Sequence, residues 1–469
     1  FKGHNISAPT RVPEPPGFPK RQMPLAGLPI GKRSALLLDK ENMTKYSISP
    51  MSSLYELYLR HPRISTDSRR IEPDSVFFAL RGASFDGNRF AADALEKGAA
   101  YAVVDDPSLP NTRPDKADRL IVVDDALQTL QTLAREHRRE LGLPILAITG
   151  SNGKTTTKEL VSRVLAEKYE VYATRGNLNN HIGVPLTLLA MTRDVEFGIV
   201  EMGASACGEI ALLCSIAEPN YGIVTNIGRA HLEGFGGPEG VRRGKGELYD
   251  WLARTGGRVF VPANDPVLMS MAAERETLAA ECYPTTLADG VEHHLEGDYN
   301  RFNVAAAVAV GRYFGVDDER IRYAVGSYRP DNHRSQKIRT GQNTLILDCY
   351  NANPSSMQAS LVNFRQEPLE GCTRKILILG DMLELGDWSD AEHRHIISLA
   401  AEIPDARILL VGPHFAKAYR SLESRPADTT LYPSQEVLAA ELRKHPVSQA
   451  LILVKGSHSI GLERLADLL

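Results

Sequence analysis

The stretch Ile145-Leu-Ala-Ile-Thr149-Gly150-Ser-Asn-Gly153-Lys154-Thr155-Thr156-Thr157 joins a short apolar run to a glycine-rich turn. The apolar run is typical of a buried parallel strand, and apolar residues recur at helical spacing after Thr157. Glycines let backbone N–H groups approach phosphate oxygens, and the N-terminus of the following helix favours negative charge. The stretch therefore predicts a phosphate cradle, with a helix that begins near Lys154.

The polar residues of this cradle have predicted roles in binding a nucleotide. Lys154 would neutralise the charge of the β- and γ-phosphates, and the Thr155 hydroxyl would ligate Mg²⁺. The general pattern has a glycine five positions before Gly153, where this chain has Ile148, so the loop is a short variant. The alternative is a structural turn that binds no nucleotide. The predicted nucleotide-binding residues are Gly150, Ser151, Asn152, Gly153, Lys154, Thr155 and Thr156.

Length and composition limit the class of protein. The chain has 469 residues, too many for one core, and about 150 residues per domain suggests three domains. A net charge of −4 gives no reason to expect a nucleic-acid binder. No apolar run approaches the roughly 20 residues that a membrane helix needs. The five scattered cysteines fit the cytoplasm and argue against a disulfide framework or a zinc site.

The first 50 residues differ from the rest of the chain. Seven of the 28 prolines lie before residue 30, and apolar periodicity is absent there. The chain begins with Phe1, whereas Met51 opens an amphipathic helical pattern that resembles a natural start. We expect residues 1–50 to be a disordered or non-native extension that is dispensable for folding. A basic, acid-poor composition also allows a targeting peptide, although serine is sparse.

Residues 51–140 have the pattern of a small α/β domain. Strands are expected at 75–80, 100–104 and 120–123, with a helix over 91–97. Two polar clusters, residues 65–69 and 82–90, lie between these elements and contain Ser68, Arg69 and Asp86. Hydroxyl groups beside an arginine suit a diphosphate or the hydroxyls of a sugar. Two ordinary surface turns are the alternative interpretation.

Residues 141–326 carry the cradle and alternate strand with helix, which predicts a parallel sheet. Strands are expected at 196–202, 221–227 and 258–261. Glu201 ends one strand, His231 follows another, and Lys245 lies on an expected helix. Each could be a solvated polar residue, but ligands of such sheets lie beyond the carboxyl ends of the strands. Beside a nucleotide cradle, a carboxylate and an imidazole suggest a Mg²⁺ site.

The last predicted domain, residues 327–469, opens with a polar, hinge-like segment over 328–336. Strands at 344–348, 375–379, 407–411 and 451–454 alternate with helices and predict a second open α/β sheet of Rossmann-like character. No G-x-G-x-x-G follows its first strand, so we do not expect a bound dinucleotide. The fold class is therefore α/β with three domains, in which a P-loop-type domain lies between a smaller N-terminal domain and a Rossmann-like C-terminal domain.

Several segments from about Met51 onward resemble the Mur ligases of peptidoglycan synthesis, most closely those that add D-alanyl-D-alanine. The motifs that begin at Asp348 and Leu379 point to that group, whereas the cradle and the Glu201 and His231 segments mark Mur ligases in general. Asn88 departs from the family pattern, which has histidine at this turn, and this affects a detail of uridine binding. The motifs are Thr149-Gly-Ser-Asn-Gly-Lys-Thr-Thr156, Gly176-Asn-Leu-Asn-Asn-His-Ile-Gly-Val-Pro185, Glu201-Met-Gly-Ala-Ser205, Asn226-Ile-Gly-Arg-Ala-His-Leu-Glu233, Asn300-Arg-Phe-Asn303, Asp348-Cys-Tyr-Asn-Ala-Asn-Pro354, Leu379-Gly-Asp-Met-Leu-Glu-Leu-Gly386 and Lys455-Gly-Ser-His-Ser459.

The resemblance implies an ATP- and Mg²⁺-dependent ligase. ATP would phosphorylate the terminal carboxylate of UDP-N-acetylmuramoyl-tripeptide, and the amine of D-alanyl-D-alanine would attack the acyl phosphate. The resemblance also implies a second Mg²⁺ held by Glu201 and His231, and a carbamylated lysine at Lys245. It further implies nucleotide contacts from Asn300, Asn303, Arg334 and Asp348, and substrate contacts from Ser68, Arg69, Asp86, Asn177, Asn180, Asn351 and Asn353.

Two other functions remain open from the sequence. One is another amide ligase of the superfamily, such as the enzyme that adds the third residue, although its Asp-Asn-Pro-Arg tetrapeptide is absent here, or folylpolyglutamate synthase. The other is a P-loop ATPase without ligase activity. We expect a cytoplasmic monomer that neither binds nucleic acid nor inserts into a membrane. The sequence leaves open whether the tripeptide ends in diaminopimelate or lysine.

Overall fold

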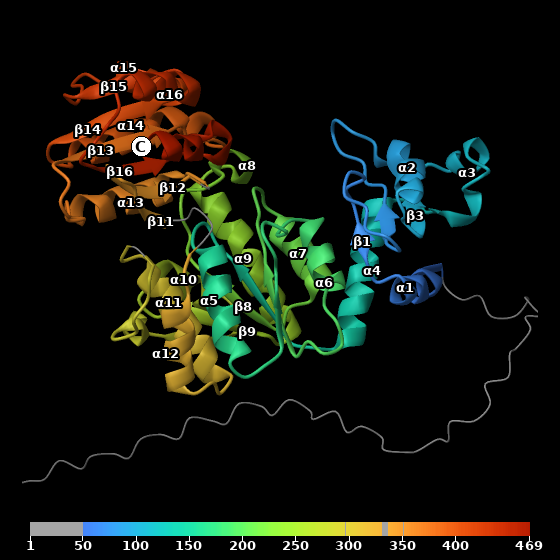
Figure 1. The fold of residues 1–469 in the computed structure, drawn as a ribbon. Helices are drawn as coiled ribbons and strands as arrows, with labels where there is room; N and C mark the ends of the chain where they lie inside the picture. Colours follow the sequence, from blue (N-terminus) through green and yellow to red (C-terminus); the bar gives the residue numbers. More distant parts are fainter. Residues whose placement is uncertain (1–49, 296, 331–335, 350) are drawn as a thin grey trace, which may run out of the picture.

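The structure, a computed structural model, describes residues 50–295, 297–330, 336–349 and 351–469. These residues form three α/β regions, each built on its own sheet (Figure 1). The predicted α/β class with three domains is confirmed. Residues 1–49 of the predicted extension and Arg334 lie outside the described residues. Within the described residues, every helix is too short or too polar to cross a membrane.

The N-terminal region is a parallel four-stranded sheet in the order β1-β2-β3-β4. Its central strands are buried, as expected for a parallel sheet covered by helices. The strands are β1 Ile64–Ser65, β2 Val76–Phe78, β3 Tyr101–Val104 and β4 Leu120–Val122; the helices are α1 Pro50–Arg60, α2 Ala91–Glu96, α3 Leu109–Thr112 and α4 Ala126–Leu141.

Helix α4 joins this region to the central one (Figure 1). Asp125 begins the helix by accepting a hydrogen bond from the Gln128 backbone at 2.8 Å, and Gly142 ends it in the left-handed conformation. His137, on its buried face, contacts the Met191 carbonyl oxygen at 2.8 Å. This packing ties the N-terminal region to the central sheet through buried side chains.

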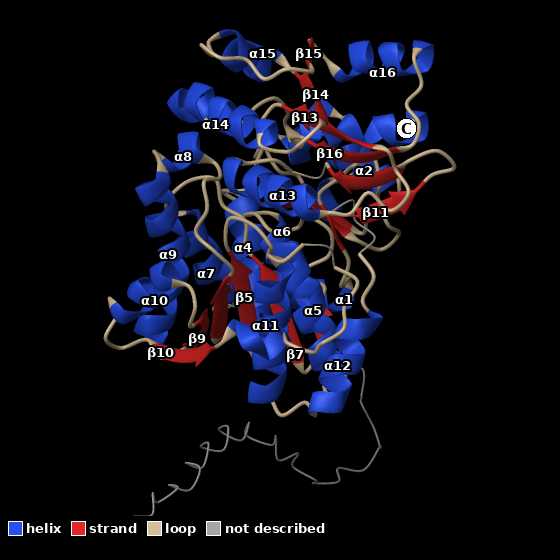
Figure 2. Ribbon diagram, turned by 90° about the vertical axis from the view of Figure 1, so that its left-hand side faces the viewer, coloured by secondary structure: helices blue, strands red, loops and turns tan. Residues whose placement is uncertain are grey.

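The central sheet is parallel and has the order β10-β9-β8-β5-β7-β6. Helices α5 and α11 pack on one face, and α4, α7 and α9 on the other (Figure 2). The strands are β5 Ile145–Thr149, β6 Val171–Ala173, β7 Phe197–Glu201, β8 Tyr221–Val224, β9 Arg258–Pro262 and β10 Ala279–Tyr283; the helices are α5 Lys154–Ala166, α6 Gly183–Leu189, α7 Glu209–Ala217, α8 Leu232–Phe235, α9 Pro238–Thr255, α10 Pro266–Ala273, α11 Asn300–Tyr313 and α12 Asp318–Ser327.

The C-terminal sheet has the order β11-β12-β16-β13-β14-β15, and only β11 is antiparallel to its neighbour among the described strands. Leu232, Phe235 and Val241 of the central region belong to the same apolar cluster as residues of this sheet, so the two regions pack together. The strands are β11 Gln336–Arg339, β12 Thr344–Asp348, β13 Arg374–Gly380, β14 Ala406–Val411, β15 Thr429–Tyr432 and β16 Ala450–Lys455; the helices are α13 Pro354–Gln366, α14 Ser389–Ala401, α15 Pro413–Arg420 and α16 Gln435–Lys444.

Candidate functional site

The candidate site lies where the connections of the central sheet diverge. Strand β5 has β7 on one side and β8 on the other, so the loops after these three strands leave the same edge. Ligands of open parallel sheets bind at such a point. The cradle follows β5, Glu201 ends β7, and His231 follows β8.

The cradle has the backbone that its glycines predict. Gly150 and Gly153 have φ of 141° and 78°, and α5 begins at Lys154 as expected. The Lys154 Nζ donates hydrogen bonds to the carbonyl oxygens of Gly150 and the next residue at 2.8 and 3.2 Å, so the ammonium lies over the loop. The Asn226 side-chain oxygen accepts from the Asn152 backbone N–H at 3.1 Å and fixes the loop from the β8 side.

We expect Gly150→Ala to disrupt the cradle. A Cβ at this position would lie 2.0 Å from the Thr225 Oγ1, and the backbone is strained for any L side chain. Together these effects should cost roughly 3 kcal/mol or more of unfolding free energy. Urea denaturation measures the loss of stability, and ADP titration measures the loss of nucleotide affinity at the cradle.

Gly256→Ala is the matched control for this substitution. Its φ is 73°, but a Cβ there meets nothing within 4 Å. It should cost only about 1–2 kcal/mol and leave ADP affinity intact. Equal effects of the two substitutions would contradict a steric role of the Gly150–Thr225 contact.

Glu201 is a buried carboxylate held by two neutral donors. Its side chain accepts the Thr155 hydroxyl and the Asn179 amide, each at 2.9 Å. The residue is only 2% exposed, and a charge buried in this way needs a cation for compensation. Oxygen ligands from a threonine and a glutamate suit Mg²⁺. The family resemblance pointed to Asn177 and Asn180 as site residues, but not to Asn179.

His231 and Lys245 have different partners. His231 has φ of 53°, and its Nδ1 contacts the Glu384 carboxylate of the C-terminal region. Burial lowers the pKa of His231, although Glu384 opposes the shift. Lys245 is 1% exposed and donates to the Ala204 carbonyl oxygen at 3.1 Å. Burial, followed by the charge of Lys154, lowers the pKa of Lys245 to about 7.

The metal ligands predicted from the sequence are thus only partly brought together. Thr155 and Glu201 are in direct contact, whereas His231 contacts Glu384. The described part of the chain holds no group of three or more His, Cys, Asp or Glu side chains placed to bind a metal ion. Phosphate oxygens, water or a modified Lys245 would have to complete a Mg²⁺ site.

The C-terminal region contacts the cradle through its first helix. Asn353 donates from Nδ2 to the Asn152 Oδ1 at 2.8 Å across 201 residues of sequence. Its own Oδ1 accepts the Ser356 N–H at 2.9 Å and caps α13. The Arg229 N–H donates to the Ser355 Oγ at 2.7 Å. The start of α13 therefore lies against both the cradle and the loop after β8.

Arg229 also forms an ion pair with Glu392 at 2.8 Å. The Glu392 side chain is 3% exposed, and its Oε2 has no hydrogen-bond partner among the described residues. We expect Arg229→Ala to lower the unfolding free energy by about 1–3 kcal/mol, because a buried carboxylate then lacks its partner. Chemical denaturation measures this difference.

Two further variants control this measurement. Adding Glu392→Gln to Arg229→Ala removes the unpaired charge and should recover part of the stability. Arg365→Ala breaks the exposed pair with Glu402 and should cost about 0–1 kcal/mol. A loss from Arg229→Ala no larger than that from Arg365→Ala would contradict a stabilising role between the regions.

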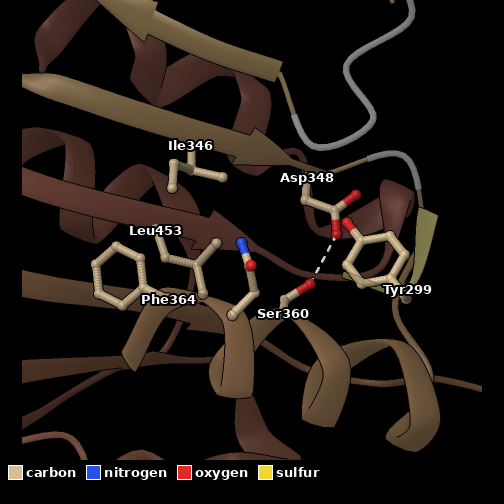
Figure 3. A pocket seen from close by; sticks show the side chains of 7 residues that line it. Tyr299, Ile346, Asp348, Ser360, Phe364 and Leu453 are labelled. Atoms are coloured by element: carbon tan, nitrogen blue, oxygen red, sulfur yellow. Dashed lines mark hydrogen bonds between the residues drawn. The ribbon is translucent and has the colours of Figure 1, made fainter. Parts of the chain in front are cut away.

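A small pocket lies between the central and C-terminal regions (Figure 3). Asp348 ends β12 and accepts the Ser360 hydroxyl at 3.0 Å, and its carboxylate faces the Tyr299 ring. Tyr299 precedes Asn300, whose Oδ1 accepts the Asn303 amide at 2.7 Å. The lining residues are Tyr299, Ile346, Asp348, Ser360, Asn363, Phe364 and Leu453.

Asn303 connects this pocket to the cradle. Its Oδ1 accepts the Thr157 hydroxyl at 3.0 Å, and a Cβ at Gly153 would lie 2.6 Å from the same oxygen. Asn300 and Asn303 therefore lie between the cradle and Tyr299, which lines the same pocket as Asp348.

Two of the predicted substrate residues of the N-terminal region form hydrogen bonds with other residues of the same region. Arg69 donates to the Asp67 carboxylate at 2.8 and 2.9 Å, which lowers the pKa of Asp67 and raises that of Arg69. The Ser68 carbonyl oxygen accepts the Lys97 Nζ at 2.7 Å. These contacts stay within the N-terminal region.

Asn88, the residue that departs from the family pattern, bonds two carboxylates at once. It donates to the Asp86 Oδ1 at 2.8 Å, and this bond lowers the pKa of Asp86. It also donates to the Asp105 Oδ1 at 2.7 Å and accepts the Asp105 N–H at 3.1 Å. The amide therefore holds Asp86, the third predicted substrate residue here, against the end of β3.

The remaining predicted substrate residues shape turns. The Asn180 Oδ1 accepts the Gly183 N–H at 2.9 Å, and the Asn177 carbonyl oxygen accepts the Asn179 N–H at 2.8 Å. The Asn351 Oδ1 accepts the N–H of the next residue at 2.8 Å. Each side chain or carbonyl group thus fixes a loop close to the cradle or to the start of α13.

Comparisons with known proteins agree along the chain. Family models match residues 62–138 as the Mur ligase family catalytic domain, 148–286 as the Mur ligase middle domain, and 333–458 as the Mur ligase glutamate ligase domain. The chain is 34% identical to UDP-N-acetylmuramoyl-tripeptide–D-alanyl-D-alanine ligase of Bacillus subtilis, over 86% of this chain and 92% of that protein. The Escherichia coli protein of the same name is 31% identical, over 86% and 92%.

Solved structures give the same result. A crystal structure of MurF from Acinetobacter baumannii matches with a TM-score of 0.75 and 30% identity, over 87% of this chain and 93% of that one. MurF from Thermotoga maritima in complex with ADP matches with a TM-score of 0.73 and 25% identity, over 87% and 97%. The sequence motifs, the three sheets and these likenesses agree, and the chain belongs to the Mur ligase family.

Proposed function

We propose that the chain is an ATP-dependent ligase that joins D-alanyl-D-alanine to UDP-N-acetylmuramoyl-tripeptide, with release of ADP and phosphate. The observation that carries the proposal is the contact of Asn353 with Asn152, which brings the C-terminal region onto the phosphate cradle. The likeness to proteins with this name, over most of their length, supports the same reaction.

In the first step, an oxygen of the tripeptide's terminal carboxylate attacks the γ-phosphorus of ATP, and the bond to the β,γ-bridging oxygen breaks to release ADP. Two anions must approach each other, so positive charge at the cradle is required. Lys154, whose ammonium lies over the loop, supplies it. Asn300, Asn303 and Asp348 would contact the nucleoside beside α5.

In the second step, the amine of D-alanyl-D-alanine attacks the acyl carbon to form a tetrahedral intermediate. The bond from this carbon to the phosphate oxygen then breaks, and the nitrogen loses a proton as the amide forms. The acyl phosphate must be kept from water during this step. The contacts of Asn353 with Asn152 and of Arg229 with Ser355 hold the C-terminal region against the cradle and would serve this purpose.

Mg²⁺ fits beside Thr155 and Glu201, because the buried Glu201 carboxylate accepts two neutral donors, the Thr155 hydroxyl and the Asn179 amide. When bound, the ion would neutralise charge on the transferred phosphate. Thr155 would ligate one ion. Glu201, His231 and a carbamylated Lys245 would hold a second ion, and burial lowers the pKa of His231.

The substrates are assigned to opposite sides of the cradle. Ser68, Arg69 and Asp86 would receive the uridine diphosphate in the N-terminal region, and Asn177 and Asn180 would shape the loop that the peptide crosses. Asn351 and Asn353, beside the cradle, would face the incoming dipeptide. We also propose that the enzyme works as a monomer in the cytoplasm.

The proposal is tested by measuring phosphate release from ATP with UDP-N-acetylmuramoyl-tripeptide, with and without D-alanyl-D-alanine. We expect release only when both are present, together with a product whose mass is their sum less one water. Phosphate release that needs neither peptide would indicate an ATPase without ligase activity. Activity with the UDP-muramoyl dipeptide and a diamino acid instead would indicate the third-residue enzyme.

A further inference from the structure

The C-terminal region contains a buried lysine for which the proposed reaction gives no role. Lys455 is the last residue of β16 and is 1% exposed. In the parallel register of β12 and β16 it lies opposite Asp348. Its Nζ donates to the Asp348 Oδ2 and to the Asn351 carbonyl oxygen, the latter at 3.3 Å. The ammonium is therefore held between the end of β12 and the segment that follows it.

Lys455 is one of two donors that orient the Asp348 carboxylate. The Asp348 Oδ2 accepts both the Lys455 Nζ and, at 3.0 Å, the Ser360 hydroxyl. Two donors on one oxygen fix the rotation of the carboxylate, and the group is left facing Tyr299 (Figure 3). Without Lys455, Asp348 would lose its charged donor, and of these two donors only the Ser360 hydroxyl would remain.

A buried ion pair is weak evidence for stability, because apolar residues of the same volume often serve as well. The lysine at this position is better explained by the group that it orients, which is the Asp348 carboxylate. It lies at the carboxyl ends of β12 and β16, which is the edge of the sheet where ligands bind. The pocket there also contains Tyr299 from the central region, next to Asn300.

We propose that Lys455 is a positioning residue for ATP: it holds the Asp348 carboxylate in the orientation in which the nucleotide meets it. The inference rests on the proposed function, and specifically on Asp348 as a nucleotide contact. Lys455 itself acts through Asp348 and touches neither substrate.

The test is the affinity of the full chain for ADP, measured by calorimetry, in Lys455→Met. Methionine has a similar length and no charge. We expect ADP to bind about tenfold more weakly, which corresponds to roughly 1.4 kcal/mol. Affinity for UDP-N-acetylmuramoyl-tripeptide should not change, because its predicted UDP-contacting residues lie in the N-terminal region.

Lys375→Met is the matched control. This lysine lies near the amino end of β13, at the opposite edge of the same sheet from Lys455. Its Nζ donates to the Phe364 and Arg365 carbonyl oxygens, both at 2.9 Å. We expect its ADP affinity to equal that of the wild type. An equal loss in Lys375→Met and Lys455→Met would overturn the inference, because it would indicate a general loosening of the region.

A double-mutant cycle with Asp348→Asn decides whether Lys455 acts through Asp348. We expect Asp348→Asn to weaken ADP binding, and Lys455→Met to change the affinity less than twofold further in that background. The double variant leaves neither charge without its partner, so the comparison with Asp348→Asn holds even if Lys455→Met alone does not fold. A full additional loss would overturn the inference. Unchanged ADP affinity in Asp348→Asn would also overturn it. The proposed function is tested separately, by the ligation assay on the wild-type protein.

Discussion

Replacing Lys154 with alanine should lower the rate of ligation about 10³-fold, roughly 4 kcal/mol of barrier, while the fold persists. In the proposed reaction, the charge of the lysine would offset the repulsion between a carboxylate and a triphosphate as they approach. Alanine at the first residue of α5 is a good helix former, so the helix should remain. Steady-state phosphate release measures the rate, and a circular dichroism melt measures stability.

Lys168→Ala is the matched control for this prediction. Like Lys154, Lys168 donates to two carbonyl oxygens, those of Phe314 and Gly315 at 3.0 and 2.9 Å. It lies beyond the opposite end of α5 from the cradle, so its removal should cost some stability and leave turnover unchanged. Turnover of Lys154→Ala equal to that of the wild type would refute the cradle assignment.

Lys245→Ala should be nearly inactive and should regain activity with formate or acetate. If Lys245 carries a carbamate, its loss removes a carboxylate from the proposed metal site, and a small acid can enter the vacated space. If Lys245 is a plain ammonium, an acid cannot replace it. Lys154→Ala supplies the contrast, because a lost cation should not be rescued by acids.

The surroundings of Lys245 favour the carbamate. Its pKa is lowered to about 7 by burial and by Lys154, and the neutral amine is the form that reacts with CO₂. Raising the pH through 7 increases the neutral fraction, so activation at a fixed concentration of dissolved CO₂ should increase in the same range. Intact-protein mass and ¹³C labelling detect the adduct on the wild type. No rescue of Lys245→Ala, together with no adduct, would rule the carbamate out.

The long central elements could be predicted from the sequence because their local patterns agree with their burial. The strand predicted at 344–348 is β12 with the same bounds, and α5 begins at the predicted Lys154. Strand β8 was predicted to continue to residue 227 but ends at Val224. Beyond the end of the strand, the Asn226 side chain accepts a hydrogen bond from the backbone of the cradle.

Short or half-exposed strands gave too weak a signal. Five strands were not predicted, and they are two to five residues long and largely not buried: β1, β6, β10, β11 and β15. Their place in the sheets follows from pairing with neighbouring strands, which is information that a local pattern does not hold. The predicted domain boundaries near residues 140 and 326 stay predictions.

The individual motifs of the site could be recognised in the sequence, but their pairings could not. The contacts Asn152–Asn353 and His231–Glu384 span 201 and 153 residues and depend on how two sheets pack. Among three nearby asparagines, only the fold of the turn determines that Asn179 contacts Glu201. The roles assigned to the site residues therefore stay proposals.

The central claim is that ATP activates the tripeptide's terminal carboxylate at the cradle. The most direct test uses UDP-N-acetylmuramoyl-tripeptide labelled with ¹⁸O in that carboxylate, and follows the label into inorganic phosphate by mass spectrometry during ligation. Because a carboxylate oxygen attacks the γ-phosphorus and leaves with the phosphate, we predict one ¹⁸O in each phosphate released. Phosphate that carries no label, while the amide product forms, would contradict activation through an acyl phosphate.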